Sequence, residues 1–282
     1  MNMLSQQSGD DRPIGMFDSG FGGLSVARAL IDLAPNENLV YVGDTGRYPY
    51  GPRPLSEVRD YSLQIAEWLI TEIGVKLIVV ACNTASAAAL DLLQSKVDVP
   101  VVGVIEPGAR AILKATKSGK VGVIGTVGTI SSGAYQKKVA DLSNEVNLSC
   151  AACPGFVEFV ERGETESEQL TVLAERLLAP LKEAEIDALL LGCTHYPFLS
   201  RTILDVMGRN VVLVSSADET AFEVREMLDS SGLATTRDGV GSWTFYSSGD
   251  TKWFHDVGSM LFGEDLGEVI PVSWDGNSVS SE

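Results

Sequence analysis

Two cysteines stand at matching places in the sequence, each directly after a run of apolar residues. Cys82 follows Leu77–Ala81, and Cys193 follows Ala188–Leu191 at an offset of 111 residues. Each is therefore expected in a turn between a strand and a helix. A thiol at a helix N-terminus has its pKa lowered by the helix dipole and by free N–H groups, so more thiolate is available as a base or nucleophile. Either cysteine alone could be a buried structural residue, but two in equivalent turns favour catalysis.

Polar residues follow both cysteines. Asn83 and Thr84 are good N-cap residues for the helix expected at Ala85–Lys96. Thr194 and His195 follow the second cysteine, and His195 is close enough to assist thiolate formation or to protonate a substrate. A satisfied, partly buried histidine is the alternative. The other histidine, His255, receives no function.

Two further segments have the composition of ligand-binding loops. Residues 18–23, Asp-Ser-Gly-Phe-Gly-Gly, follow an apolar run, and their glycines allow backbone N–H groups to approach a carboxylate or phosphate. The spacing fits neither a dinucleotide fingerprint nor a P-loop. Residues 43–51 also follow an apolar run and suit substrate contact, although they could form only a rigid loop.

Cys150 and Cys153 have the spacing of half a metal site or of a redox pair. A second such pair is missing from the sequence, so neither a metal site nor a redox function is expected. Glu158 could be a surface carboxylate or a proton-handling residue, and its spacing alone favours the surface.

The elements that must position these residues alternate between strands and helices. Short apolar runs fit parallel strands covered on both faces, and the segments between them have helical periodicity. The expected strands are 14–17, 39–42, 77–81, 101–105, 121–124, 188–191 and 211–214. The expected helices include 24–34, 56–73, 85–96 and 168–183. This order predicts an α/β fold with doubly wound parallel sheets and binding residues at the carboxyl ends of the strands.

A weak internal similarity suggests that the fold has two lobes. Residues 14–20 resemble 121–127, and residues 77–84 resemble 188–195, at nearly equal offsets. Chance similarity between apolar strands is the alternative to a duplication. The predicted lobes are residues 1–100 with 213–282, including a loose tail at 1–12, and residues 101–212. Residues 232–282 show few helical signals, and those after about Asn277 are expected to be disordered.

Composition narrows the class of partner. A formal net charge of −17 argues against nucleic acid, which is bound mainly through Lys and Arg. The sequence has no apolar run of about 18 residues and no secretory signal at its start, so no membrane span is expected and the expected compartment is the cytoplasm.

Four motifs occur in an order that resembles the glutamate racemase family of the aspartate/glutamate racemase superfamily. They are Asp18-Ser19-Gly20-x-Gly22-Gly23, Tyr48-Pro49-Tyr50-Gly51, Ala81-Cys82-Asn83-Thr84-Ala85-Ser86 and Gly192-Cys193-Thr194-His195-Tyr196-Pro197. The resemblance spans about residues 14–225, and Gly125-Thr126, residues 154–158 and residues 245–250 extend it.

The resemblance implies a cofactor-independent isomerase that supplies D-glutamate for cell wall peptidoglycan, and hence for cell shape. It implies two pseudo-symmetric lobes with the active site between them, and a homodimer. By the same resemblance, Cys82 takes the proton from D-glutamate and Cys193 from L-glutamate, assisted by Asp18, Glu158 and His195. The implied substrate-binding residues are Asp18, Ser19, Tyr50, Gly51, Asn83, Thr84, Thr126, Thr194 and His195.

Two other functions stay open at this point. The same fold could serve an aspartate racemase, or a maleate isomerase or decarboxylase of the superfamily, although the loops at residues 18–20 and 48–51 favour glutamate. A non-catalytic amino-acid-binding protein is the second alternative. It would have no need for Cys82, Cys193 and His195.

Overall fold

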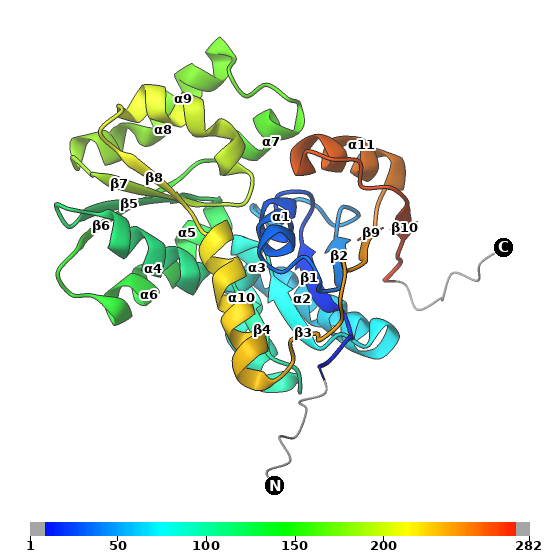
Figure 1. Cartoon of the computed structure of the whole chain (residues 1–282). Helices are drawn as coiled ribbons and strands as arrows, with labels where there is room; N and C mark the ends of the chain where they lie inside the picture. The colour runs from blue at the N-terminus through cyan, green and yellow to red at the C-terminus, as the bar shows by residue number, and fades with distance from the viewer. Residues whose placement is uncertain (1–8, 275–282) are drawn as a thin grey trace, which may run out of the picture.

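The computed structural model describes residues 9–274, which form two parallel β-sheets flanked by helices (Figure 1). The first sheet has the strand order β10-β9-β2-β1-β3-β4 and the second the order β6-β5-β7-β8. The strands of the first sheet are β1 (Ile14–Asp18), β2 (Leu39–Gly43), β3 (Leu77–Val80), β4 (Val101–Gly103), β9 (Trp243–Ser247) and β10 (Val269–Pro271). Those of the second are β5 (Lys120–Gly125), β6 (Asn147–Ala152), β7 (Ala188–Gly192) and β8 (Val212–Ser215).

Helices follow most of the strands, as the alternation in the sequence predicts. They are α1 (Leu24–Leu33), α2 (Leu55–Trp68), α3 (Asn83–Lys96), α4 (Ile105–Ala115), α5 (Val127–Ser131), α6 (Ala134–Leu142), α7 (Phe156–Glu161), α8 (Glu168–Glu183), α9 (Ser200–Met207), α10 (Ala217–Ser231) and α11 (Thr251–Phe262). A π-helical turn (Leu69–Ile73) extends α2, and a 3-10 turn (Tyr196–Leu199) precedes α9. None of the helices within residues 9–274 is long and apolar enough to span a membrane.

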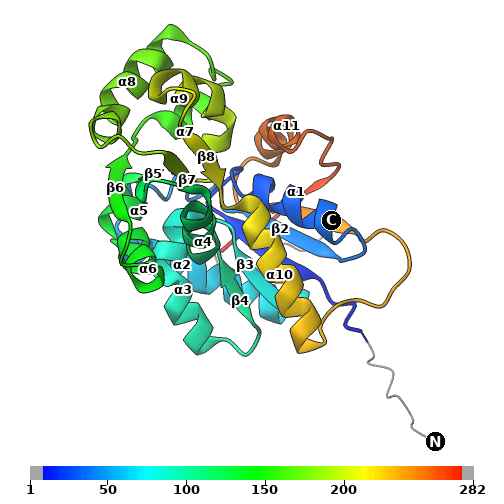
Figure 2. The same cartoon turned by 60° about the vertical axis from the view of Figure 1, so that its left-hand side comes forward.

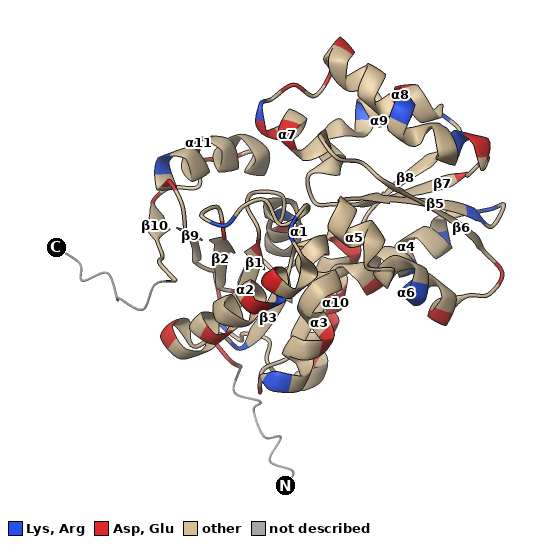
Figure 3. Cartoon of the chain, turned by 180° about the vertical axis from the view of Figure 1, so that it is seen from behind, with Lys and Arg blue, Asp and Glu red and all other residues tan. Residues whose placement is uncertain are grey.

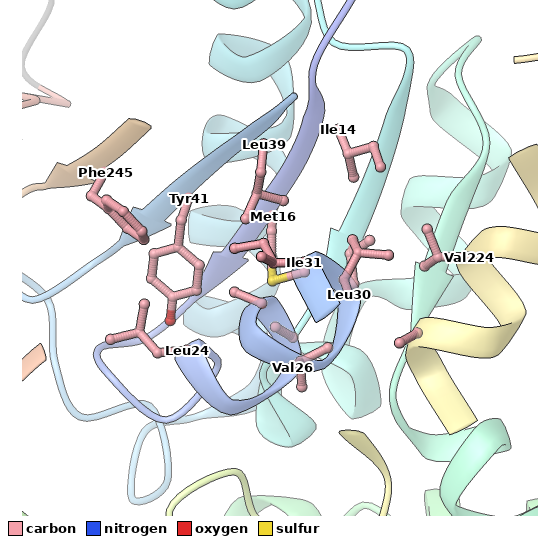
Figure 4. Packing of buried hydrophobic residues seen from close by; sticks show 14 of the residues in the cluster. Ile14, Met16, Leu24, Val26, Leu30, Ile31, Leu39, Tyr41, Val224 and Phe245 are labelled. Atoms are coloured by element: carbon pink, nitrogen blue, oxygen red, sulfur yellow. The ribbon is translucent and has the colours of Figure 1, made fainter. Parts of the chain in front are cut away.

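The central strand β1 shows why the apolar runs are continuous. Its side chains alternate between two cores, so Ile14 and Met16 pack toward α1 and α10 while Phe17 packs toward α2 and α3. Figure 4 shows Met16 and Tyr41 from the strands lying against Leu24 and other residues of α1. Because both faces are covered, the whole strand is buried and its polar residues are confined to its end.

The two sheets repeat one strand order, which agrees with the similarity between the halves of the sequence. In the first sheet β2, β1, β3 and β4 lie side by side, and in the second β6, β5, β7 and β8 do so. Thus β1 corresponds to β5, and β3 to β7. Strands β9 and β10 extend only the first sheet. Figure 2 shows the resulting two-lobed shape, with α4 and α10 near the junction.

The chain crosses between the sheets a few residues later than the predicted lobe boundaries. β4, at residues 101–103, pairs with β3 in the first sheet, and β8, at residues 212–215, pairs with β7 in the second. Helix α4 packs on β7 and β8, whereas α10 packs against α1. The boundaries between the lobes therefore lie at about residues 104 and 216, because the edge strand β4 belongs to the first sheet and the edge strand β8 to the second.

The C-terminal segment shows few helical signals in the sequence, yet it folds into regular elements. It contains β9, α11 and β10. Asp250 caps α11 by accepting a hydrogen bond from Trp253 N at 2.9 Å, and Gly263 ends the helix with φ 84°. The expected disorder after Asn277 lies outside the described residues, as does most of the expected N-terminal tail. Residues 10 and 11 contact Lys76, Asn38 and Thr235.

Acidic and basic residues lie mostly on the outer helices and the connecting loops (Figure 3). One buried pair is an exception: Lys76 Nζ lies 2.6 Å from Glu37 Oε2, with both side chains almost fully buried. Asp18 at the end of β1 and Asp44 just after β2 are further buried carboxyl groups, and most of the other acidic residues lie at the surface.

Candidate active site

A cavity of about 100 Å³ lies where the carboxyl ends of the strands of both lobes meet. A cavity of this size fits a small molecule. All twelve residues singled out from the sequence line it: Asp18, Ser19, Tyr50, Gly51, Cys82, Asn83, Thr84, Thr126, Glu158, Cys193, Thr194 and His195. The loops after β1, β2 and β3 supply the residues from the first lobe, and those after β5, β6 and β7 supply the rest.

Cys82 itself caps helix α3, since its Sγ accepts a hydrogen bond from Ala85 N at 3.5 Å. Asn83 and Thr84, expected as caps, are instead the first residues of the helix. The thiol is only 5% exposed. Burial and the charge of Asp18 raise its pKa to about 12, although the backbone N–H groups of Ala85 and Ser19 act the other way. The predicted lowering of this pKa was therefore wrong, and Cys82 is a thiol at neutral pH.

Cys193 has a different environment. It is 6% exposed, and its Sγ lies 4.0 Å from Nδ1 of His195. The other ring nitrogen of His195, Nε2, lies 3.1 Å from Oε1 of Glu161. Burial by itself lowers the histidine pKa, but the hydrogen bonds to Cys193 and Glu161 outweigh it and raise the pKa to about 10. At neutral pH His195 is thus an imidazolium, and its Nδ1 faces the sulfur of Cys193.

Asp18 joins the two lobes. Its Oδ1 accepts a hydrogen bond from Gly20 N at 2.8 Å, and its Oδ2 accepts one from Thr194 Oγ1 at 3.2 Å. Complete burial raises the pKa of this carboxyl above its ordinary value, against the charge of His195 and these hydrogen bonds. Asp18 therefore lies near Cys82 on one side and near Thr194 and His195 on the other.

Hydroxyl and amide groups line the cavity between the thiols. Thr84 Oγ1 lies 2.9 Å from Thr126 Oγ1, which links α3 of the first lobe to the second lobe. Asn83 Nδ2 donates to Tyr135 OH at 2.6 Å, while its buried Oδ1 has no hydrogen-bond partner among the described residues. Such an unpaired oxygen is costly unless a ligand donor reaches it.

The structure distinguishes two glutamates of α7. Glu158 lies in the cavity wall but is exposed, and no hydrogen bond joins its carboxylate to another described residue. Glu161 lies one helical turn later and contacts His195. Sequence reasoning passed over Glu161. Its spacing of three residues from Glu158 was the only available signal, because both positions share one face of a short helix.

The two cysteines of the Cys-x-x-Cys pair lie in different surroundings. Cys150 lies within β6, whereas Cys153 is buried and lines the cavity, so setting the pair aside overlooked a third thiol near the site. Within residues 9–274 no group of three or more His, Cys, Asp or Glu residues could hold a metal ion. His255 is partly exposed and pairs with Asp256 and Asp265 on the surface.

The turn after β1 approaches the second lobe so closely that only glycine fits at position 22. A Cβ atom there would lie 2.2 Å from Thr194 Oγ1 and 2.5 Å from His195 Nδ1. We expect Gly22→Ala to lower kcat/KM by about 10²-fold, because small displacements of catalytic groups are that costly. Steady-state kinetics with circular dichroism will test this. Gly20→Ala, whose Cβ would meet only the Tyr48 ring at 3.1 Å, should have a smaller effect. Equal losses in both variants would contradict the explanation.

Two parallel-sheet lobes, each with a thiol at a shared cavity, define the class of protein as a two-lobed α/β fold with its site between the lobes. The model of the Asp/Glu/Hydantoin racemase family matches residues 20–224. The chain belongs to this family. Glutamate racemase of Corynebacterium diphtheriae is 47% identical over 260 residues, which cover 92% of this chain and 97% of that protein.

Solved structures give the same result. A glutamate racemase of Bacillus anthracis superposes with a TM-score of 0.88 at 40% identity, covering 93% of this chain and 97% of that one. Glutamate racemase of Francisella tularensis in complex with D-glutamate superposes with a TM-score of 0.88 at 32% identity, covering 95% of this chain and 100% of that one. The resemblance and the two-lobed α/β fold expected from the sequence are confirmed.

Proposed function

We propose that the protein interconverts L- and D-glutamate by proton transfer at the α-carbon between Cys82 and Cys193, without a cofactor. The observation that carries the proposal is the contrast between the two thiols at one cavity. Burial and Asp18 keep Cys82 protonated, whereas the positive charge of His195 lies beside the sulfur of Cys193. Inversion at a carbon requires one acid and one base on opposite faces, which this pair supplies.

From L-glutamate, the Cys193 thiolate takes the α-proton and the Cys82 thiol gives its own proton to the opposite face. The products are D-glutamate, a Cys193 thiol and a Cys82 thiolate. From D-glutamate the same two transfers run in reverse. The protonation state is therefore a property of the two thiols together, and each turnover changes which of them carries the proton.

The thiolate of Cys82 needs support, because its pocket favours the neutral form. The N–H group of Ala85 already points at the sulfur, and the ammonium of a bound amino acid would add a positive charge. The charge of Asp18 opposes this thiolate, and Asp18 assists instead by pairing with the ammonium of the bound amino acid.

The α-proton is a weak acid, so charge that develops on the substrate must be met by fixed donors. We assign this function to the hydroxyl, amide and backbone groups of the cavity wall. They are those of Ser19, Tyr50, Gly51, Asn83, Thr84, Thr126, Thr194 and His195, with Asp18 facing the ammonium. The unpaired Oδ1 of Asn83 is a further acceptor for the ammonium.

The family resemblance also indicates how the product is used and in what form the enzyme acts. D-glutamate made by this reaction supplies peptidoglycan synthesis, and the enzyme acts in the cytoplasm as a homodimer. The family resemblance supports these assignments. Sedimentation velocity at micromolar concentration tests the dimer, and a single species with the mass of one 30.1 kDa chain would reject it.

Racemisation in deuterated water provides the direct test. We expect each glutamate enantiomer to yield its mirror image with solvent deuterium at the α-carbon, in enzyme freed of metal by dialysis against chelator and of pyridoxal phosphate by treatment with hydroxylamine. Mass spectrometry after chiral separation gives the result. Deuterium-free product, or activity only after a cofactor is restored, would reject the proposal. Aspartate serves as the comparison substrate, and faster turnover of aspartate would reassign the specificity.

A further inference from the structure

The buried carboxylate of Asp44 gathers four side-chain donors at the end of β2. Oδ2 accepts hydrogen bonds from Arg47 Nε at 2.8 Å and from the Tyr50 hydroxyl. Oδ1 accepts from Ser248 Oγ at 2.6 Å and from Trp274 Nε1 at 2.7 Å. We call these five residues the Asp44 cluster. Asp44 is 0% exposed, so each bond is made away from water and contributes more than it would at a surface.

The two carboxylate oxygens of Asp44 bind two different parts of the chain. Oδ2 binds residues of the loop that leads from β2 to the cavity, and Oδ1 binds the C-terminal segment, more than 200 residues away. Further bonds run alongside this link: Thr45 Oγ1 lies 2.6 Å from Ser247 Oγ, and Gly46 N donates to Ser248 Oγ at 3.0 Å. The loop is therefore attached to the C-terminal segment along its first half.

The second half of this loop forms part of the cavity. Tyr50 is fully buried and lines it, but its hydroxyl is occupied by Asp44, so Tyr50 offers the cavity its ring and backbone. Gly51 follows, and its carbonyl accepts a hydrogen bond from Gly128 N of the second lobe at 2.9 Å. A shift of Tyr50 would thus move Gly51 against the opposite lobe.

Trp274 is itself held on several sides. Its ring lies 4.9 Å from the Arg47 guanidinium and 6.2 Å from the ring of Trp68. Its carbonyl accepts a hydrogen bond from Gln64 Nε2 at 2.9 Å, and Gln64 Oε1 accepts one from Arg47 Nη1 at 2.7 Å. A side chain that is held by several contacts can in turn hold its hydrogen-bond partner in one orientation.

We propose that Trp274 and Ser248 are positioning residues for substrate binding, which act through Asp44 to hold Tyr50 and Gly51 in the cavity wall. The C-terminal segment then helps to shape the active site. The kinetic form of this inference rests on the proposed function. Its structural form, that these donors order residues 45–51, does not.

The kinetic test compares two equal substitutions in the C-terminal segment. Trp274→Phe removes the donor to Asp44. Trp243→Phe removes an Nε1–H that has no partner among the described residues, at the opposite end of β9. We expect Trp274→Phe to raise KM for both enantiomers about fivefold to tenfold with kcat within about twofold, as loss of a hydrogen bond to a charged group that affects binding should do. Trp243→Phe should keep wild-type values. Equal KM values in wild type and Trp274→Phe, or equal rises in both variants, would overturn the inference.

A double-mutant cycle tests the shared carboxylate oxygen. Ser248→Ala should raise KM in the same direction, and the double variant with Trp274→Phe should differ from the product of the single effects by about threefold or more, because both donors bind Oδ1. Strictly multiplicative effects would show that the two residues act separately and would contradict the positioning through Asp44.

Hydrogen exchange separates this inference from the proposed function. In Trp274→Phe the amides of residues 45–51 should exchange about tenfold faster than in wild type, and in Trp243→Phe they should not. This result needs no activity. A wild-type protein without racemisation would reject the proposed function alone, and unchanged exchange in Trp274→Phe would reject the inference alone.

Discussion

Replacing either Cys82 or Cys193 by Ala will lower glutamate racemisation by a factor of about 10³ or more, because each variant lacks the acid or base for one face of the α-carbon. The loss must be equal in the two directions when expressed as kcat/KM. L- and D-glutamate have the same free energy in water, so no substitution can change the ratio of the two values. Steady-state racemisation therefore cannot tell the thiols apart.

Exchange of the α-proton with deuterated water distinguishes them. With Cys82 removed, the remaining thiolate can still take the proton of L-glutamate and return a deuteron to the same face. With Cys193 removed, exchange should be confined to D-glutamate. Nuclear magnetic resonance of each pure enantiomer measures this directly, and exchange of both enantiomers by either variant would refute the assignment.

Cys150→Ala is the matched control. Cys150 lies in β6 and is absent from the cavity wall, and it too is a free thiol. Its substitution should leave racemisation within about twofold of wild type, as for a site that does not touch the reacting groups. A loss comparable with that of Cys82→Ala would mean that the assay reports folding and not proton transfer.

The main strands could be predicted because parallel strands impose their own pattern, whereas most of the cavity residues were implied by the family resemblance. A strand such as β1, which is buried on both faces, must be apolar throughout, and its first polar residue, Asp18, marks the edge at which ligands bind. The same logic located Cys82 and Cys193. It failed for β9, where Trp243 and Thr244 are only partly buried and the apolar run is broken.

Electrostatic properties were harder to predict, because they depend on contacts between distant residues. The place of Cys82 in a strand-to-helix turn was apparent, but the burial that raises its pKa comes from the packed lobes. Likewise, the two C-terminal donors of Asp44 lie 204 and 230 residues from it in the chain. Glu158 and Glu161 share a helix, and only the orientation of α7 toward the second cysteine decides between them.

Glu161→Gln should lower kcat/KM by about 10²-fold, because it removes the charge that stabilises the His195 imidazolium while keeping a hydrogen-bond acceptor. Glu158→Gln is the matched control, since it makes the same change one turn away on an exposed side chain. We expect that variant to stay within about threefold of wild type. The opposite order of the two effects would restore Glu158 as the assisting carboxylate.

The pH dependence gives a second measure of the same contact. The His195 pKa is raised from 6.5 to about 10, so its contribution to the free energy of unfolding is complete below pH 6.5 and is lost as the pH rises through 10. Glu161→Gln lowers this pKa. The stability difference between wild type and Glu161→Gln, measured by urea unfolding, should therefore be larger at pH 7 than at pH 10. The alkaline limb of the kcat/KM profile should also move to lower pH in Glu161→Gln and stay in place in Glu158→Gln. A stability difference that is constant across this range would show that Glu161 does not hold the proton on His195.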